Sequence, residues 1–236
     1  MLTRHFNIDL AHALQINKHC YICHQTSTQL ICKHCITDAH IAHLPVPGFD
    51  ILQQSRYAEH LLPPYYHHFY ALAEYSGMVK RLINRLKFSH DLLAAQVLST
   101  LFMQFVYPRI EQLEDLPEAF IPLPLSNLRY LNRGYNQARI LAQHLSKKSQ
   151  IRVIDGLKRT KHTLAQSKLD KEQRAQNIHN AFALARKLNF QHVGLVDDVV
   201  TTGATINSAC KTIVEAYPDI RISVWAMAVT PLKRRS

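Results

Sequence analysis

Near its C-terminal end the chain reads Val193-Gly194-Leu195-Val196-Asp197-Asp198-Val199-Val200-Thr201-Thr202-Gly203-Ala204-Thr205. An apolar segment typical of a buried strand runs into two adjacent carboxylates, and a loop of small and hydroxyl residues then opens a helix. That loop offers backbone N–H groups, threonine hydroxyls and a helix N-terminus to a phosphate. Gly203 has no Cβ atom, so the backbone can approach the phosphate closely at this position. Because Asp197 and Asp198 can accept hydrogen bonds from vicinal hydroxyls, the stretch predicts a ribose 5-phosphate site.

A Walker-B strand of a nucleotide triphosphatase also ends in acidic residues. That class of enzyme additionally needs a Gly-x4-Gly-Lys-Ser/Thr loop, whose lysine reaches the terminal phosphates. No such loop occurs anywhere in the sequence. The sequence therefore disfavours triphosphatase chemistry.

The sequence around this stretch alternates between strand and helix patterns. Strands are predicted at residues 120–125, 151–157, 192–197 and 220–229, and helices at residues 135–148 and 203–216. Upstream, a helix is predicted from Ser76 onward, and Asp91 is a candidate N-cap for a second helix that reaches about Val106. This alternation predicts an α/β fold with a parallel sheet and right-handed crossovers, in which ligands bind at the carboxyl ends of the strands.

Four of the five cysteines form two Cys-x2-Cys pairs, Cys20 with Cys23 and Cys32 with Cys35. Two such pairs can complete a tetrahedral four-sulfur site, which suits a structural zinc ion and leaves no open position for catalysis. Disulfides and an iron–sulfur or redox site are the alternatives, and disulfides are disfavoured in a reducing cytosol. Cys210 stands alone in an apolar helical stretch and is interpreted as a buried core thiol.

The composition is that of a basic globular protein. The 236 residues include 28 Lys and Arg against 17 Asp and Glu, a formal net charge of +11, and 47% are hydrophobic. These values exclude the disordered and low-complexity classes, and the positive charge favours polyanionic partners such as phosphorylated metabolites, nucleic acid or acidic lipid. No run is apolar and long enough for a spanning helix of about 20 residues, and the N-terminal stretch lacks a signal-peptide core. We therefore expect a cytoplasmic protein.

Further short motifs lie along the chain in a fixed order. They are the four cysteines, Tyr75-Ser76-Gly77, Lys80-Arg81-Leu82-Ile83 with Lys87, Ile121-Pro122-Leu123-Pro124-Leu125-Ser126, Arg133-Gly134-Tyr135-Asn136-Gln137-Ala138, Leu157-Lys158-Arg159-Thr160, Gln166-Ser167-Lys168-Leu169, Arg174, Asn177 and Ala181-Phe182. Together with residues 193–205 they resemble the ComF family, which includes ComFC and GntX. Residues 193–205 themselves resemble the phosphoribosyl pyrophosphate (PRPP) signature of type I phosphoribosyltransferases. The resemblance covers nearly the whole chain.

The resemblance implies a role for each matching residue. Asp197 and Asp198 would bind the ribose hydroxyls at the catalytic centre. Mg2+ would be coordinated by oxygens of the pyrophosphate and the ribose. Residues 159–174 would form a mobile loop that closes over PRPP. The implied PRPP-binding set is Val200, Thr201, Thr202, Gly203, Ala204 and Thr205 for the 5-phosphate, Leu123, Pro124, Leu125 and Ser126 with Arg133 for the pyrophosphate, and Arg159 and Arg174 in the mobile loop.

The resemblance also implies the division of the chain. We expect a zinc module over residues 1–50, a helical connecting or hood region over residues 51–117, and a phosphoribosyltransferase-like α/β domain over residues 118–236. Some proteins of this fold bind PRPP without transferring its phosphoribosyl group, so the motif points to the ligand more firmly than to an enzymatic reaction.

The sequence leaves two candidate functions for the protein. The first, implied by the resemblance, is a competence protein that binds PRPP with Mg2+ and handles single-stranded DNA during DNA uptake. The second is a metabolic phosphoribosyltransferase that transfers the phosphoribosyl group of PRPP to an unidentified nitrogen base. The candidate DNA-binding residues are Lys80, Arg81, Arg85 and Lys87, with Arg129, Arg133 and Arg139 near the expected pocket rim. A solvated helix face is the alternative interpretation of the first four.

The tyrosine-rich segment allows two interpretations as well. Its aromatic side chains could stack on the bases of a single strand or simply belong to the core. They are Tyr57, Tyr65, Tyr66, Phe69, Tyr70 and Tyr75.

Overall fold

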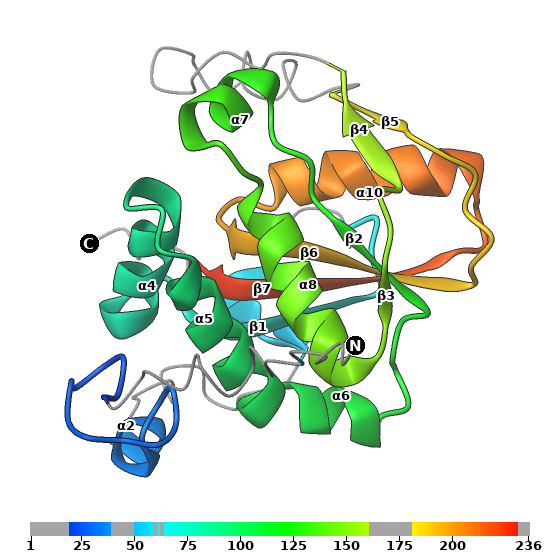
Figure 1. Ribbon diagram of the computed structural model, residues 1–236. Coiled ribbons are helices and arrows are strands. Elements are labelled where there is room, and N and C mark those ends of the chain that lie inside the picture. Colours follow the sequence, from blue (N-terminus) through cyan, green and yellow to red (C-terminus); the bar gives the residue numbers. More distant parts are fainter. Residues whose placement is uncertain (1–18, 39–49, 59–60, 62–63, 161–180, 231–236) are drawn as a thin grey trace, which may run out of the picture. The chain divides into compact units, whose positions relative to one another are not determined.

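Figure 1 presents the computed structural model of the chain. The structure describes residues 19–38, 50–58, 61, 64–160 and 181–230. These fall into two compact units, one within Met1–His40 and the other within Ile41–Ser236. The smaller unit contains helix α2 (Lys33–Asp38) and the four cysteines.

The larger unit is built on a five-stranded parallel sheet in the order β1-β7-β6-β2-β3. The strands are β1 (His68–Glu74), β2 (Ala119–Pro122), β3 (Arg152–Val153), β6 (His192–Val200) and β7 (Arg221–Val229). A separate antiparallel pair consists of β4 (Leu157–Arg159) and β5 (Phe182–Leu184). The expected α/β fold with a parallel sheet is confirmed.

The larger unit also contains helices, which lie before and between the strands along the chain. They are η2 (Ile51–Gln53), α3 (Ser55–Ala58), α4 (Gly77–Phe88), α5 (Leu92–Phe105), α6 (Tyr107–Gln112), α7 (Asn127–Arg133), α8 (Gln137–Ser149) and α10 (Ala204–Ala216). Asp91 caps α5 as expected, because its carboxylate accepts a hydrogen bond from the Ala94 N–H at 3.3 Å. Asn136 caps α8 in the same way, through the Ala138 N–H at 3.0 Å.

The strand order fixes which face each helix covers. From β1 to β2 and from β2 to β3 the chain moves toward the β3 edge, whereas from β6 to β7 it moves the other way. Since parallel crossovers are right-handed, α4, α5 and α8 cover one face and α10 covers the opposite face (Figure 1). The direction reverses between β2 and β6, and ligands of open α/β sheets bind at such a reversal, beyond the carboxyl ends of the strands.

Aromatic rings fill the core between the sheet and α5. The Trp225 ring on β7 stacks on Phe102 with centroids 5.3 Å apart and meets the edge of Phe120 at 4.9 Å. Gly194 on β6 makes room for this group, because a Cβ atom there would lie 3.0 Å from the Phe120 ring and 2.9 Å from Pro117. Position 194 therefore excludes any larger side chain unless these neighbours move.

Two features of the larger unit differ from the sequence interpretation. Strand β1 lies within the expected connecting region 51–117, yet it is an edge strand of the sheet, paired with β7. The single strand expected at residues 151–157 is two short strands in different sheets, β3 and β4, because the chain leaves the sheet edge after Val153. Gly156 lies in this bend, where a Cβ atom would stand 2.8 Å from the Ile121 side chain.

The tyrosine-rich segment is mostly core. Four of the six aromatic side chains named above are buried, namely Tyr57, Tyr66, Phe69 and Tyr70. Tyr65 is 40% exposed and Tyr75 is partly buried. The core interpretation therefore holds for the buried four. Among the described residues, every helix is too short or too polar to cross a bilayer.

Buried polar side chains join the amino ends of the strands. Asp115, 4% exposed, accepts a hydrogen bond from the Tyr70 hydroxyl at 2.7 Å and from the Arg221 guanidinium. His192 at the start of β6 pairs with the Ser223 hydroxyl at 2.9 Å. These bonds connect β1, β6 and β7 near the amino ends of the strands, away from the carboxyl end of β6, and they satisfy polar groups that would otherwise be costly to bury.

This network predicts an acid-sensitive fold. Burial lowers the pKa of His192 from 6.5 to about 4, although the Asp115 carboxylate opposes the shift. Below pH 6.5 the unfolded chain therefore binds a proton that the folded chain does not, and the free energy of unfolding should fall as the pH drops from 6.5 toward 5, by up to about 1.4 kcal/mol per pH unit. Denaturant unfolding of His192→Asn should show a flatter slope over this range. An unchanged slope in His192→Asn would contradict the assignment.

Candidate ribose phosphate site and metal cluster

The residues expected to bind the sugar phosphate follow the two strands that flank the reversal point. Pro122 at the end of β2 is the register partner of Val196 on β6, and the Leu123 N–H donates to the Val196 carbonyl at 2.9 Å. Leu123–Ser126 therefore begins beside the strand that carries Asp197 and Asp198. The fold brings these two predicted segments together, as expected for a ligand site of an open α/β sheet.

The two carboxylates occupy consecutive positions of β6. Because successive side chains of a strand point to opposite faces, they leave the strand on different sides. Asp198 is buried and its Oδ1 lies 2.8 Å from the Lys87 ammonium of α4. Asp197 is less buried, and its Oδ1 accepts a hydrogen bond from the Asp198 N–H at 2.8 Å. The Asp198 carboxylate is thus paired with a cation, whereas the Asp197 carboxylate accepts a hydrogen bond from the backbone of the next residue.

The predicted phosphate loop contains a glycine in a backbone conformation that other residues rarely adopt. Gly203 adopts φ 70°, in the left-handed region, and a Cβ atom there would lie 2.9 Å from the Leu61 side chain. Thr201 and Thr202 are exposed, and α10 starts at Ala204, followed by a half-buried Thr205. Val200 is buried, so it contributes backbone rather than side chain to the loop. The loop therefore exposes two threonine residues just before the N-terminus of α10, where an anion can be bound.

The expected pyrophosphate loop is held to the end of α4 by two residues. The Tyr135 hydroxyl donates to the Leu86 carbonyl, and the Asn136 amide donates to the Leu123 carbonyl at 3.0 Å. Leu123 and Ser126 are buried, and Pro124 and Leu125 are half-buried. Consequently α4, which ends beside Asp198, is also linked to the loop that follows β2.

The three predicted arginines have different placements. Arg133 lies over the Phe88 ring at the end of α4, 5.6 Å from its centroid, and donates to Gln137 at 3.2 Å. Arg159 is on β4 and stacks on Phe182 at 5.2 Å, so the structure associates it with the β4–β5 pair. Arg174 and most of the expected mobile loop lie outside the described residues.

The four predicted DNA-binding cations of α4 do not form one free surface. Lys80 and Arg81 are exposed, and Lys80 lies 5.8 Å from the centre of the Tyr75 ring. Arg85 pairs with Asp91 at 2.7 Å. Lys87 instead pairs with Asp198, one of the two acids of the candidate site. The helical period explains this division, since Lys87 lies four residues after buried Ile83 and therefore borders the buried face of the helix.

Of the remaining rim residues, Arg139 is exposed and pairs with Asp155 at the surface. Arg129 is part of α7. The contact between Lys87 and Asp198 was not predicted from the sequence, which placed Lys87 only among the candidate DNA-binding cations.

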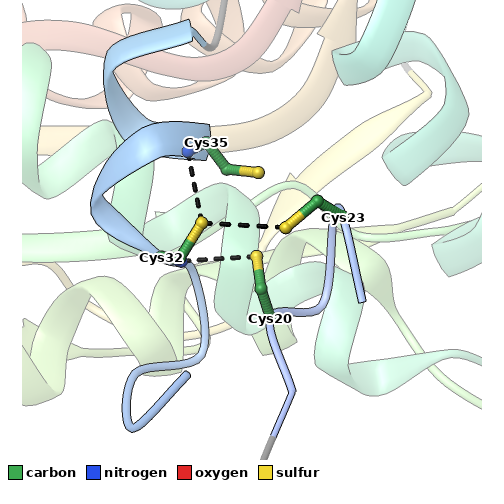
Figure 2. Close-up of side chains that lie close together, drawn as sticks. All are labelled: Cys20, Cys23, Cys32 and Cys35. Atoms are coloured by element: carbon green, nitrogen blue, oxygen red, sulfur yellow. Dashed lines mark hydrogen bonds between the residues drawn. The ribbon is translucent and has the colours of Figure 1, made fainter. Parts of the chain in front are cut away.

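The four cysteines converge in the smaller unit. Figure 2 shows their side chains pointing toward one another, and all four Sγ atoms lie within 4.8 Å of each other. The Cys23 and Cys32 sulfurs are 3.7 Å apart, close to the spacing of about 3.8 Å that Zn–S bonds of 2.3 Å impose on a tetrahedron. No disulfide joins these four cysteines. They could hold a structural zinc ion, and within the described part of the chain no other group of His, Cys, Asp and Glu has this geometry.

Electrostatics of the thiols also fit a metal site. Burial opposes ionisation of Cys20, but N–H groups, among them Ile22 at 3.4 Å and Cys32 at 3.3 Å, outweigh it and lower the pKa of Cys20 to about 6. Burial and the neighbouring thiols raise the pKa of Cys35. Four thiolates so close together repel one another, and a bound divalent cation removes this obstacle to ionisation.

We expect one zinc ion per chain, and its loss should unfold the smaller unit, because metal binding supplies folding energy in such modules. Cys20→Ser and Cys35→Ser should each abolish stoichiometric zinc in elemental analysis and remove the protection of residues 19–38 from amide hydrogen exchange. Cys210→Ala, a cysteine variant outside the cluster, should retain one zinc ion. Wild-type protein with ordered residues 19–38 and no zinc would contradict the assignment.

The sequence was compared with known proteins. It matches none of the protein-family models against which it was scanned. It is 34% identical over 221 residues to Competence protein F of Haemophilus influenzae, an alignment that covers 84% of this chain and 96% of that protein.

Other relatives are more distant. DNA utilization protein YhgH of Escherichia coli K12 is 29% identical over 215 residues, which cover 89% of this chain and 90% of that protein. Competence protein ComFC of Bacillus subtilis is 28% identical over 156 residues, which cover 65% of this chain and 60% of that protein. Since the similarity to Competence protein F spans nearly its whole length, this chain belongs to the ComF family of competence proteins.

Proposed function

We propose that this ComF-family protein binds PRPP and acts in DNA uptake, with single-stranded DNA as its nucleic-acid partner. The observation that carries the proposal is the placement of Asp197, Asp198 and the Gly203 loop at the reversal point between β2 and β6. A ribose 5-phosphate bound there has its phosphate against the start of α10 and its hydroxyls against the carboxylates.

PRPP fits this site better than a sugar monophosphate, because a second loop lies beside it. Leu123–Ser126 starts next to Val196 and would face the pyrophosphate on the anomeric carbon. Mg2+ would be bound through oxygens of the ligand, as expected for an ion that keeps much of its oxygen shell and takes few protein ligands. Zinc is the ion we propose for the cysteine cluster, with a structural role only.

The role in DNA uptake follows from the relatives, which are named as competence proteins and a DNA utilization protein. A formal charge of +11 supports a polyanionic partner. Lys80 and Arg81 are exposed on α4 and available to a phosphate backbone. Their side chains, rather than the phosphate loop, would contact DNA, because the loop is shaped for one terminal phosphate.

Neutralising the acids should remove PRPP binding. We expect Asp198→Asn and Asp197→Asn each to weaken PRPP binding about tenfold or more, and the double variant to abolish it, since hydrogen bonds to charged groups contribute about 1.5–3 kcal/mol. Thr202→Val should weaken binding as well. Calorimetric titration with PRPP and Mg2+ measures these losses. Asp155→Asn, which neutralises an exposed acid on the surface, is the control, and wild-type affinity in the double variant would refute the site.

The DNA surface has its own test. Lys80→Glu combined with Arg81→Glu should weaken single-stranded DNA binding for every sequence and flatten the plot of log affinity against log salt by roughly 0.7 per lost phosphate contact. Lys147→Glu with Lys148→Glu, an exposed pair at the end of α8, is the charge-matched control. Equal losses in both double variants, or no DNA binding by the wild type at low salt, would contradict this surface.

Pyrophosphate release that depends on an added base would favour the alternative of a metabolic transferase.

A further inference from the structure

Lys87 is positioned unlike the other cations of α4. Its side chain is 17% exposed, and its ammonium lies 2.8 Å from the Oδ1 atom of Asp198, whose side chain is 10% exposed. Withdrawing a lysine and an aspartate this far from water is costly unless the two charges are paired. The pair therefore fixes the end of α4 against the carboxylate that we assign to the ribose hydroxyls.

The ammonium retains the capacity to bind a ligand. A lysine has three N–H donors, and the bond to Asp198 uses one of them. A carboxylate in turn has about four lone-pair sites, so Asp198 can accept from both the lysine and a ribose hydroxyl. Ligand binding at Asp198 thus does not require Lys87 to leave, and a ligand there lies next to a positive charge.

The contacts around Lys87 indicate which end of the ligand this charge faces. The Leu86 carbonyl, one residue earlier, accepts from Tyr135, and the neighbouring Asn136 donates to the Leu123 carbonyl. The end of α4 that carries Lys87 is therefore connected, through Tyr135 and Asn136, to the loop after β2. The loop that receives the 5-phosphate instead follows β6 and begins α10. The two anion-binding elements belong to different ends of a sugar.

We propose that Lys87 is the specificity-determining residue of this site: it holds Asp198 and binds the anionic group on the anomeric carbon, so that the site prefers a 1-pyrophosphorylated sugar to ribose 5-phosphate. The inference rests on the proposed PRPP function. The inference also explains why Asp198 is paired with a lysine. A cation between Asp198 and a pyrophosphate offsets the repulsion between these two anions.

The test compares two ligands that share the sugar and the 5-phosphate. Calorimetric titrations with PRPP and with ribose 5-phosphate, both with Mg2+, give the ratio of their dissociation constants. Lys87→Gln removes the charge but keeps a donor for Asp198, and Lys87→Arg keeps the charge. Lys211→Gln is the matched control, since Lys211 also pairs with a carboxylate, Glu215 at 3.7 Å on α10. Thermal melting establishes that each variant is folded.

In Lys87→Gln the preference for PRPP should fall about tenfold or more, as expected for loss of a charge-assisted contact, while ribose 5-phosphate binds nearly as in the wild type. Lys87→Arg and Lys211→Gln should keep most of the preference. If Lys87→Gln weakens both ligands by the same factor, or changes neither, Lys87 is only a structural partner of Asp198 and the inference is wrong, although the PRPP function stands. If the wild type binds neither ligand, the proposed function itself is wrong.

Discussion

The pairing of β6 with β2 on one side and β7 on the other is the constraint on which the site depends. It puts a buried strand at the point where the direction of the crossovers reverses. The carboxyl ends of β6 and β2 then lie side by side, and the segments that follow the two strands begin there. The placement of the two acids and of the Gly203 loop in the proposed ligand site follows from this arrangement of strands.

The same strand has opposite electrostatic environments at its two ends. At its amino end His192 is buried and neutral within a network that includes Asp115 and Tyr70, and this end stabilises the fold. Toward its carboxyl end Asp198 is charge-paired with Lys87, two residues before the strand ends and the loop to α10 begins. Polar groups at the amino end are satisfied within the protein, whereas the carboxyl end carries the site that we propose for the ligand.

Local patterns in the sequence predicted the parts of the structure that local physics determines. The loop with Gly203 that opens a helix, the α4 and α8 helices and the convergence of the cysteines all followed from spacing, capping or glycine placement. Contacts between distant segments could not be predicted in this way. Strand β1 lies in a segment that the sequence assigned to a helical connecting region, and its pairing with β7 reveals it as an edge strand. Lys87 was predicted as one of four DNA-binding cations, and its partner Asp198 is evident only once α4 is packed beside β6. A helix face identifies buried and exposed positions but not the partner across a cleft.

The central claim is that a sugar phosphate binds at the carboxyl ends of β2 and β6. Backbone amide NMR of the isotopically labelled protein during titration with PRPP and Mg2+ tests it most directly. The account predicts chemical-shift changes concentrated at residues 197–205 and 123–126, with smaller changes near Lys87 and little change at residues 19–38. Saturable binding that perturbs other surfaces, such as the exposed face of α4 around Arg81, while leaving the amides of Thr201–Thr205 unchanged would contradict it.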